Sequence, residues 1–519
     1  MADDRRMDAV LRRGRPRLLK TLSALTVAFL VLTGATLSAR AEPTSVVLGP
    51  TTLQGVAQRG VHAFKGIPYA QPPTGERRWM APLPVELERG NVDATRFGAI
   101  CPQTRPEAAM REPMAEDCLT LNVWTPGPGK ERRPVLVWIH GGGFRAGSGN
   151  LPGEVLASRG VVVVSLNYRL GPLGFFAHEA LEGAPANFGL MDMVEALRWV
   201  HAHIGAFGGD PDNVTIFGVS AGGMAVSLLL ATSAADGLYQ RAIAQSGYGT
   251  WALPRSRTAP EPGPLSMTLG RADSAEALAH ELVARVASGP QSRARLYALD
   301  AQMLVSALAG FQLPIVDGTT LPEEPGVVFA RGDGNRVPII TGGNSYEGSV
   351  MPASGITLDA YAAMLGDSLE AAQSLYAGDF AVSRERGLSR IFGDNRYLLA
   401  ARVLGNGADA VGGNVWLYYV DYPPDARTPG TPHGWDAGTL WRETFDDPIA
   451  RAIAERLRGY WVNFATRGDP NGRGSLSGRA SDTTTRAGWC WAPPTRPGPA
   501  CCSLSWTSSK PGSGSAFSR

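Results

Sequence analysis

The chain has 519 residues, of which 44% are hydrophobic and 18% charged, so it can bury a large core and is not a disordered polypeptide. Its 49 Lys and Arg residues nearly balance 47 Asp and Glu residues, which leaves a net charge of +2. No overall basic field indicates nucleic-acid binding, and we expect the function to reside in a local site.

Residues 1–41 have the layout of a secretory signal peptide. They carry eight basic and three acidic residues, and without them 41 basic residues face 44 acidic ones. Basic residues from Arg12 to Lys20 precede an apolar run over residues 22–32, and Ala39 and Ala41 supply the small residues that a signal peptidase reads. The run is short for a permanent anchor, although an uncleaved anchor is the alternative. We expect export to the periplasm or the medium, without stable membrane insertion after cleavage.

Short apolar runs alternate with longer helix-like segments through the rest of the chain. The predicted strands are Val135–Ile139, Val161–Ser165, Val214–Phe217 and Val337–Ile340, and the predicted helices are Asp192–His203, Met224–Ala231 and Ser274–Ala287. Buried strands that alternate with helices predict an α/β fold with a large, mostly parallel central sheet flanked by helices. The Pro- and Arg-rich residues 255–265 are expected to form a surface loop.

A Gly-Val-Ser-Ala-Gly motif at residues 218–222 lies between a predicted strand and a predicted helix. Glycines on both sides of Ser220 permit a tight turn that exposes the hydroxyl, and a helix N-terminus favours developing negative charge. The alternative is an ordinary Gly-Ser loop, but the strand–turn–helix context favours a nucleophile elbow.

A second glycine motif, His140–Gly143, also ends a predicted strand. Residues without side chains let backbone N–H groups point at a reacting oxygen, as an oxyanion hole requires. A flexible hinge or a phosphate loop would look similar. A phosphate loop needs Lys followed by Ser or Thr after the glycines, and residues 144–146 do not supply them.

A serine nucleophile in this context needs an acid and a histidine later in the chain. After Ser220 the only histidines are His280, inside an Ala-rich predicted helix, and His433, in a predicted loop. Glu347 follows the strand Val337–Ile340, at the carboxyl end where open α/β sheets place their sites. A solvated loop carboxylate and a loop histidine without a catalytic role are the alternatives, and the residues alone leave both open.

Further motifs point to a family. In order, the chain contains Phe64–Ala70, Glu116–Asn122, His140–Phe144, Asn167–Arg169, Phe207–Pro211, Gly218–Gly222, Gln245–Gly247, Tyr460–Phe464 and Gly468–Asn471. This series, over about residues 45–471, resembles the type-B carboxylesterase (cholinesterase-like, para-nitrobenzyl esterase-like) family of the α/β-hydrolase fold. The resemblance implies one hydrolase domain over residues 42–472.

The resemblance also implies a role for individual residues. It matches Ser220 to the nucleophile, Glu347 to the acid and His433 to the base of a Ser-His-Glu triad. The remaining matches are Gly142, Gly143 and Ala221 as oxyanion-hole donors, Ser246 as a buried supporting serine, and Cys101 with Cys118 as a disulfide. It implies that small-molecule esters are hydrolysed through an acyl-enzyme, and we expect no cofactor. No Cys or His cluster has zinc-ligand spacing, so we expect no metal.

Three positions depart from the family pattern. Val219 stands where the family often has Glu, Met193 stands where Gln is usual, and the loop between Cys101 and Cys118 has no aromatic residue. Because cholinesterases place a cation-binding Trp in that loop, a true cholinesterase is disfavoured. The alternatives from other classes are a non-catalytic binding homologue, against which the retained Ser220 argues, and an acyltransferase. The sequence leaves the acyl and alcohol specificity and the oligomeric state open.

The tail, residues 473–519, loses all strand and helix periodicity. A disordered extension is one interpretation. A changed reading frame near Gly472 is the other, because back-translating Leu476–Arg479 and reading one base earlier yields Pro-Glu-Trp-Pro, which resembles a Trp-Pro segment of the family. We predict the changed frame, and resequencing the gene tests it.

Overall fold

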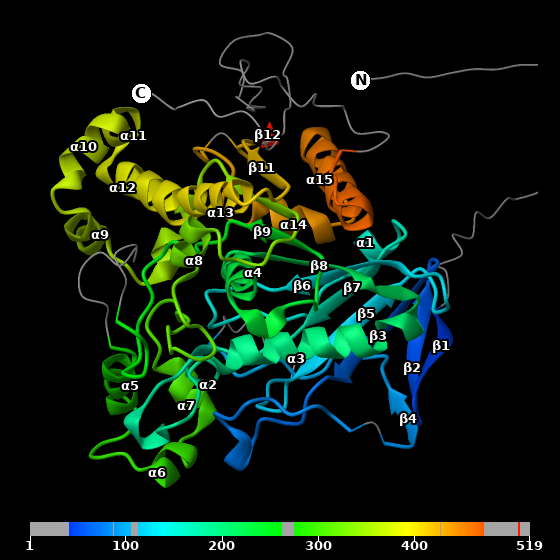
Figure 1. Cartoon of the computed structure of the whole chain (residues 1–519). Coiled ribbons are helices and arrows are strands. Elements are labelled where there is room, and N and C mark those ends of the chain that lie inside the picture. The colour runs from blue at the N-terminus through cyan, green and yellow to red at the C-terminus, as the bar shows by residue number, and fades with distance from the viewer. Residues whose placement is uncertain are drawn as a thin grey trace, which may run out of the picture. The chain divides into compact units, whose positions relative to one another are not determined.

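One sheet of twelve strands organises the computed structural model, which describes residues 41–86, 88–104, 113–261, 274–425, 427–471 and 507–508 (Figure 1). The strands are β1 (Glu42–Leu48), β2 (Thr51–Gln58), β3 (Val61–Pro68), β4 (Gly90–Asp93), β5 (Thr120–Thr125), β6 (Arg133–Ile139), β7 (Val162–Leu166), β8 (Gly209–Val219), β9 (Arg241–Gln245), β10 (Ile339–Asn344), β11 (Val415–Val420) and β12 (Thr507–Ser508).

The strand order is β1-β2-β3-β5-β7-β6-β8-β9-β10-β11-β12, with β4 beside β2. Neighbouring strands from β7 to β11 are parallel, whereas β1, β2, β3, β5 and β7 pair in antiparallel fashion. The mostly parallel sheet predicted from the sequence is therefore confirmed, with an antiparallel N-terminal part. Since parallel strands point their carboxyl ends the same way, the loops after β6, β8, β9, β10 and β11 meet at one edge.

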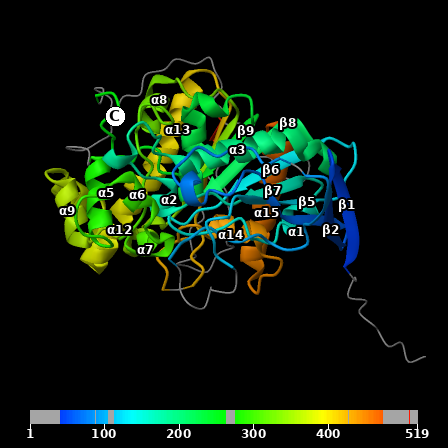
Figure 2. The ribbon, with the colours of Figure 1, turned by 90° about the horizontal axis from the view of Figure 1, so that it is seen from below.

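Helices cover both faces of the sheet. They are α1 (Glu154–Ala157), α2 (Gly171–Gly174), α3 (Phe188–His203), α4 (Ala221–Ala231), α5 (Ala275–Ala284), α6 (Arg293–Tyr297), α7 (Ala301–Ser306), α8 (Pro325–Arg331), α9 (Leu358–Leu365), α10 (Ser368–Leu375), α11 (Ala377–Val382), α12 (Arg384–Gly393), α13 (Leu399–Ala410), α14 (Trp435–Trp441) and α15 (Pro448–Arg467). Figure 2 shows α3 and α13 on one side of the strands, with α1 and α14 on the other.

Alternation along the buried strands divides the core into two layers. Val135, Val137 and Ile139 of β6 pack with residues of α3 and α4, whereas Leu136 and Trp138 pack with residues of α1, α14 and α15. Successive side chains of a strand point to opposite faces, so a strand covered on both faces is apolar throughout. This pattern explains why these strands read as continuous apolar runs in the sequence.

The predicted elements exist, with shifted boundaries. The structure extends the predicted strand Val214–Phe217 to Gly209–Val219 and moves the strand at Val337–Ile340 to Ile339–Asn344. Of the expected surface loop at 255–265, residues 257–261 are exposed or half-buried, and residues 262–265 lie outside the described residues. Arg255 is only 9% exposed and forms an ion pair of 2.8 Å with Glu324, so the start of this segment is buried.

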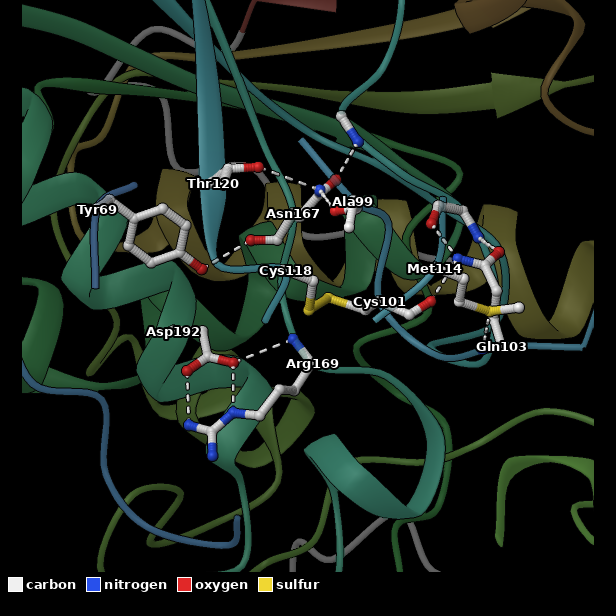
Figure 3. The surroundings of a disulfide bond; sticks show 12 residues. Tyr69, Ala99, Cys101, Gln103, Met114, Cys118, Thr120, Asn167, Arg169 and Asp192 are labelled. Carbon is white, nitrogen blue, oxygen red and sulfur yellow. Dashed lines mark hydrogen bonds and ion pairs between the residues drawn. A yellow bond between two sulfur atoms is a disulfide. The ribbon is translucent and has the colours of Figure 1, made fainter. Parts of the chain in front are cut away.

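Cys101 and Cys118 form a disulfide, the pairing that the family resemblance implied (Figure 3). Close to it, the guanidinium of Arg169 donates to both carboxylate oxygens of Asp192, at 2.8 and 2.6 Å. Both side chains are buried, and such a bidentate pair fixes the orientation of its two partners. Arg169 belongs to the motif Asn167–Arg169. Its pairing with Asp192 holds the chain segment after β7 against α3.

The predicted signal peptide lies outside the described residues, and so does almost all of the tail. In the tail, only Thr507 and Ser508 are described, and their backbone pairs with β11 in antiparallel fashion. The described residues belong to one unit, residues 41–519. None of the helices in the described ranges has the length and apolar character that crossing a membrane requires.

Candidate active site

Ser220 lies in the sharp turn between β8 and α4. Its φ of 59° and ψ of −120° are rare for a residue with a side chain, and such strain is typical of nucleophile elbows. The backbone N–H of Ser220 donates to the Gln245 carbonyl at 2.9 Å, and its own carbonyl accepts from Met224 at 2.8 Å. Bonds on both sides of the turn therefore hold the strained backbone in place.

The two glycine motifs of the sequence lie side by side. A Cβ atom at Gly222 would lie 2.1 Å from the Ile139 carbonyl oxygen, and one at Gly141 would lie 3.3 Å from Cβ of Ser220. Only a residue without a side chain permits the first approach. The glycines thus allow the end of β6 to pass directly beside the serine turn.

Three backbone N–H groups flank this turn. Gly142 and Gly143 have φ values of 108° and 63°, which place them in the left-handed region that favours glycine. Ala221 is the first residue of α4, where helical N–H groups have no intrahelical acceptor. None of the three donates a backbone hydrogen bond to another residue in the described part of the chain. They are available to an external oxygen.

His140 supports the glycine loop as a neutral side chain. Its ring stacks on Tyr168 with 4.3 Å between centroids, and its Nδ1–H donates to the Gly141 carbonyl at 2.8 Å. Burial lowers the pKa of His140 to about 4, against a smaller opposing effect of that hydrogen bond. The imidazole is therefore uncharged at neutral pH and adds no positive charge to the loop.

Glu347 and His433 meet although they lie 86 residues apart. Glu347 begins a short 3-10 helix, η6 (Glu347–Ser354), just after β10, and His433 lies in the loop between β11 and α14. Nδ1 of His433 forms a hydrogen bond with Oε2 of Glu347, and the backbone N–H of His433 donates to Ser349 at 2.8 Å. The structure thus brings together the acid and the base that the sequence pattern indicated.

The other ring nitrogen of His433 is Nε2. Nε2 is buried and makes no hydrogen bond within the described ranges, and none joins it to Ser220. In enzymes without bound substrate, such contacts are often longer than a hydrogen bond and tighten during the reaction. The free nitrogen is the atom that a catalytic base would use.

The second oxygen of Glu347 is also fully engaged. Oε1 accepts from the Ser246 hydroxyl at 2.7 Å, the Asn344 backbone N–H at 2.5 Å and the Asn344 side chain at 3.2 Å. The Glu347 side chain is completely buried. Its neighbours therefore fix the position of the carboxylate that orients His433.

A second buried carboxylate, Asp436, continues this network, and its role was not predicted from the sequence. Asp436 accepts hydrogen bonds from Asn344 at 2.9 Å, Gln245 at 2.9 Å and Tyr418 at 2.6 Å. The Asn344 amide thus bridges Asp436 and Glu347. The available signal was the position of Asp436, three residues after His433, together with Gln245 in a motif that also contains Ser246.

The other histidine that follows Ser220 in the sequence, His280, lies elsewhere. His280 is on α5, about half exposed, with Nε2 3.5 Å from a carboxylate oxygen of Glu179 and its ring 4.6 Å from that of His178. The described part of the chain has no group of three or more His, Cys, Asp or Glu side chains that could hold a metal ion.

A mainly apolar cavity of about 270 Å³ lies beside Phe311. Phe311 lines it and packs so close to Gly143 that a Cβ atom there would lie 2.2 Å from the ring. The backbone N–H of Gln312 also donates to the Gly143 carbonyl at 2.9 Å. The segment around Phe311 therefore separates this cavity from the candidate oxyanion donors.

A serine elbow, free backbone donors and an acid–histidine pair at the carboxyl edge of a parallel sheet define the class of α/β hydrolases. The model of the carboxylesterase family matches residues 43–489. The chain therefore belongs to the carboxylesterase family. The match extends past Gly472 into residues that the structure does not describe, so the predicted change of reading frame stays a prediction.

Named relatives agree with this assignment. The chain is 42% identical to the para-nitrobenzyl esterase of Bacillus subtilis over 57% of its own length and 61% of the relative. It is 32% identical to the fumonisin B1 esterase of Sphingopyxis macrogoltabida, over 79% and 80% of the two chains, and 32% identical to carboxylesterase 1E of Mus musculus, over 82% and 84%.

Solved structures place the fold in the same group. A carboxylesterase of Geobacillus stearothermophilus superposes with a TM-score of 0.71 and 31% identity, covering 83% of this chain and 92% of that one. A PNB esterase superposes with a TM-score of 0.70 and 30% identity over the same shares of the two chains. The predicted α/β-hydrolase fold is confirmed.

Proposed function

We propose that the protein hydrolyses small carboxylic esters through a Ser220–His433–Glu347 triad and an acyl-enzyme. The observation that carries the proposal is the hydrogen bond between His433 and the buried Glu347 carboxylate at the sheet edge that also carries the strained Ser220 turn. Catalytic triads combine these three features.

In the first half of the reaction, Nε2 of His433 takes the proton of the Ser220 hydroxyl while the oxygen attacks the ester carbonyl carbon. The carbonyl oxygen becomes an oxyanion, which accepts hydrogen bonds from the N–H groups of Gly142, Gly143 and Ala221. The tetrahedral intermediate collapses, the C–O bond to the alcohol breaks, and the alcohol leaves with the proton of His433.

In the second half, His433 takes a proton from water, and the hydroxide oxygen attacks the acyl-enzyme carbonyl. Collapse releases the carboxylic acid and returns the proton to Ser220. Glu347 orients the imidazole and stabilises the imidazolium that forms in each half. Ser246 and Asn344 act as positioning residues for Glu347, because they bond the carboxylate oxygen that His433 does not use.

The proposed function extends to the location of the protein, and it has an acyltransferase as an alternative. Export of the mature chain is supported by the leader sequence and by the Cys101–Cys118 disulfide, since disulfides persist in oxidising compartments. An acyltransferase would use the same acyl-enzyme but pass the acyl group to an alcohol. Product analysis with added alcohol separates the two activities.

The test is pre-steady-state hydrolysis of p-nitrophenyl acetate by the mature chain and its Ser220→Ala variant. We expect a burst of p-nitrophenol equal to the enzyme concentration, absent from the variant, because the acyl-enzyme forms faster than water resolves it. A folded wild-type protein that hydrolyses no ester would overturn the proposal and favour a binding homologue.

A further inference from the structure

Arg396 is a buried cation that no carboxylate of the described residues neutralises. It lies in a short π-helical turn, η7 (Asp394–Leu398), between α12 and α13, and is only 1% exposed. Its Nε and Nη2 atoms are buried without a hydrogen-bond partner, and no carboxylate within the described ranges forms an ion pair with it. Buried charges are normally paired, and π-helical turns frequently mark functional sites.

The other buried arginines show how this protein usually treats such a charge. Each contacts a carboxylate: Arg78 pairs with Glu116, Arg169 with Asp192, Arg255 with Glu324 and Arg458 with Glu455. Arg396 is the exception among the buried arginines of the described chain. Since an unpaired guanidinium is costly to bury, the exception requires an explanation.

Aromatic rings surround Arg396 in place of a carboxylate. Its guanidinium carbon lies 4.3 Å from the ring centre of Tyr248 and 4.2 Å from that of Trp251, and the rings of Phe311, Phe392 and Tyr397 lie within 5.8 Å. Ring faces attract a cation and partly offset its lost hydration. The ring faces do not accept the directional hydrogen bonds that a carboxylate would accept from the guanidinium N–H groups.

This cluster borders the proposed active site on two sides. The ring of Tyr397 packs on His433 with 4.6 Å between centroids, and Phe311 packs against the oxyanion residue Gly143. The guanidinium therefore lies beside neighbours of both the base and the oxyanion hole.

Two phenols of the cluster face the guanidinium. Among the described residues, the buried phenolic oxygens of Tyr248 and Tyr397 make no well-formed hydrogen bond, like Nε2 of His433, although Arg396 interacts with both. Burial raises the pKa of Tyr248 to about 12, although the charge and the side-chain contact of Arg396 oppose the rise, so this phenol stays neutral. Because buried polar atoms are nearly always satisfied, a cation and phenols that satisfy one another only in part indicate a place for a polar ligand.

We propose that Arg396 binds a free carboxylate of the substrate, so that the preferred substrates are esters that also carry an anionic carboxylate. This inference rests on the esterase function proposed above and specifies its substrate class. The planar guanidinium matches a carboxylate in two parallel N–H···O bonds, and the dry surroundings strengthen them. Neutral esters leave the charge unpaired and bind without that gain.

Two matched pairs of substrates test the proposal. Monoethyl glutarate against ethyl glutaramate places the carboxylate or its neutral amide on the acyl side, and 4-carboxyphenyl acetate against 4-carbamoylphenyl acetate places it on the alcohol side. We expect the anionic member of at least one pair to have a kcat/KM about 10- to 100-fold higher, the range of a hydrogen-bonded charge pair. The pair that responds tells which part of the ester lies near Arg396.

Arg396→Met is the decisive variant, because it removes the charge while keeping a long side chain among the rings. It should abolish the preference, so that the kcat/KM of the anionic ester divided by that of its neutral partner falls to about one, since the charged contact is lost. Arg145→Gln is the matched control. Arg145 lies 5.6 Å from the same Phe311 ring but donates to the Ala353 carbonyl, so its loss should preserve the preference.

Binding without turnover supplies a second measurement. The Ser220→Ala variant should bind the anionic member of the responding pair at least about tenfold more tightly than the amide in calorimetry, and adding Arg396→Met should remove the difference. Equal kcat/KM within both pairs for the wild type, or a preference that survives in Arg396→Met, would overturn the inference. A folded wild-type protein that hydrolyses none of these esters, neutral ones included, would instead contradict the esterase function itself.

Discussion

Ser246 donates a hydrogen bond of 2.7 Å to Oε1 of Glu347, a residue 101 positions away, while His433 bonds the other oxygen of the same carboxylate. The contact exists because β9 and β10 are parallel neighbours, so the residues that follow them lie together. With both oxygens engaged, the carboxylate cannot rotate away from the histidine. The residues that follow β9 and β10 therefore position the histidine together.

Ser246→Ala should lower kcat about tenfold with little change in KM. The hydroxyl is one of the donors to Oε1, and its removal leaves a buried acceptor less well satisfied while the substrate contacts are intact. Steady-state hydrolysis of p-nitrophenyl acetate measures both parameters. Ser227→Ala is the control, because that buried serine bonds the Gly223 carbonyl and not the acid. Equal losses in the two variants would contradict the role of Ser246.

Glu347→Gln should reduce kcat on the order of 10³- to 10⁴-fold, as the loss of the orienting carboxylate does in serine hydrolases. Asp436→Asn, which alters the same network without touching His433, should cost far less, on the order of tenfold. Burst amplitude and kcat for both variants make the comparison. A Glu347→Gln enzyme with near-normal kcat would remove Glu347 from the triad.

Replacing both Cys101 and Cys118 by Ser should lower the free energy of unfolding by about 3 kcal/mol, because the bond closes a loop of 17 residues in the unfolded chain. Urea unfolding of the double variant beside the wild type measures this difference. The kcat of the double variant should stay unchanged at 25 °C, because the disulfide contacts none of the triad residues. An unfolding free energy within 0.5 kcal/mol of wild type, on the order of an ordinary surface change, would contradict the expected stabilisation.

Asp394 should make stability depend on pH in an unusual direction. Burial raises the pKa of its carboxyl group from 3.8 to about 6, although the Tyr376 hydroxyl donates to it at 3.0 Å. Between these values the folded state holds the proton more tightly than the unfolded state, so this group destabilises the fold as pH rises from about 4 to 6.

Asp394→Asn removes that effect. Its unfolding free energy, relative to wild type, should therefore increase by up to about 3 kcal/mol between pH 4 and pH 7. Urea unfolding of both proteins at the two pH values measures the change, and the comparison cancels the titration of all other groups. A difference that does not vary with pH would show that Asp394 titrates normally.

The sequence by itself determined the elements whose causes are local. Gly218–Gly222 identifies the serine turn because the glycines, the serine, the strand before and the helix after are contiguous. The apolar runs identified the central strands because a strand buried on both faces has no polar positions. The order of the motifs along the chain indicated Glu347 as the acid and His433 as the base. The chemistry of these residues alone left other roles open.

Only the tertiary structure decided the contacts between distant residues. Arg255 was assigned to a surface loop, yet it pairs with Glu324, 69 residues later, inside the fold. The Asp436 network and the unpaired charge of Arg396 were invisible for the same reason. Whether a polar side chain is exposed, satisfied or left without a partner depends on which strands and helices become neighbours, and that is set by packing of the whole chain.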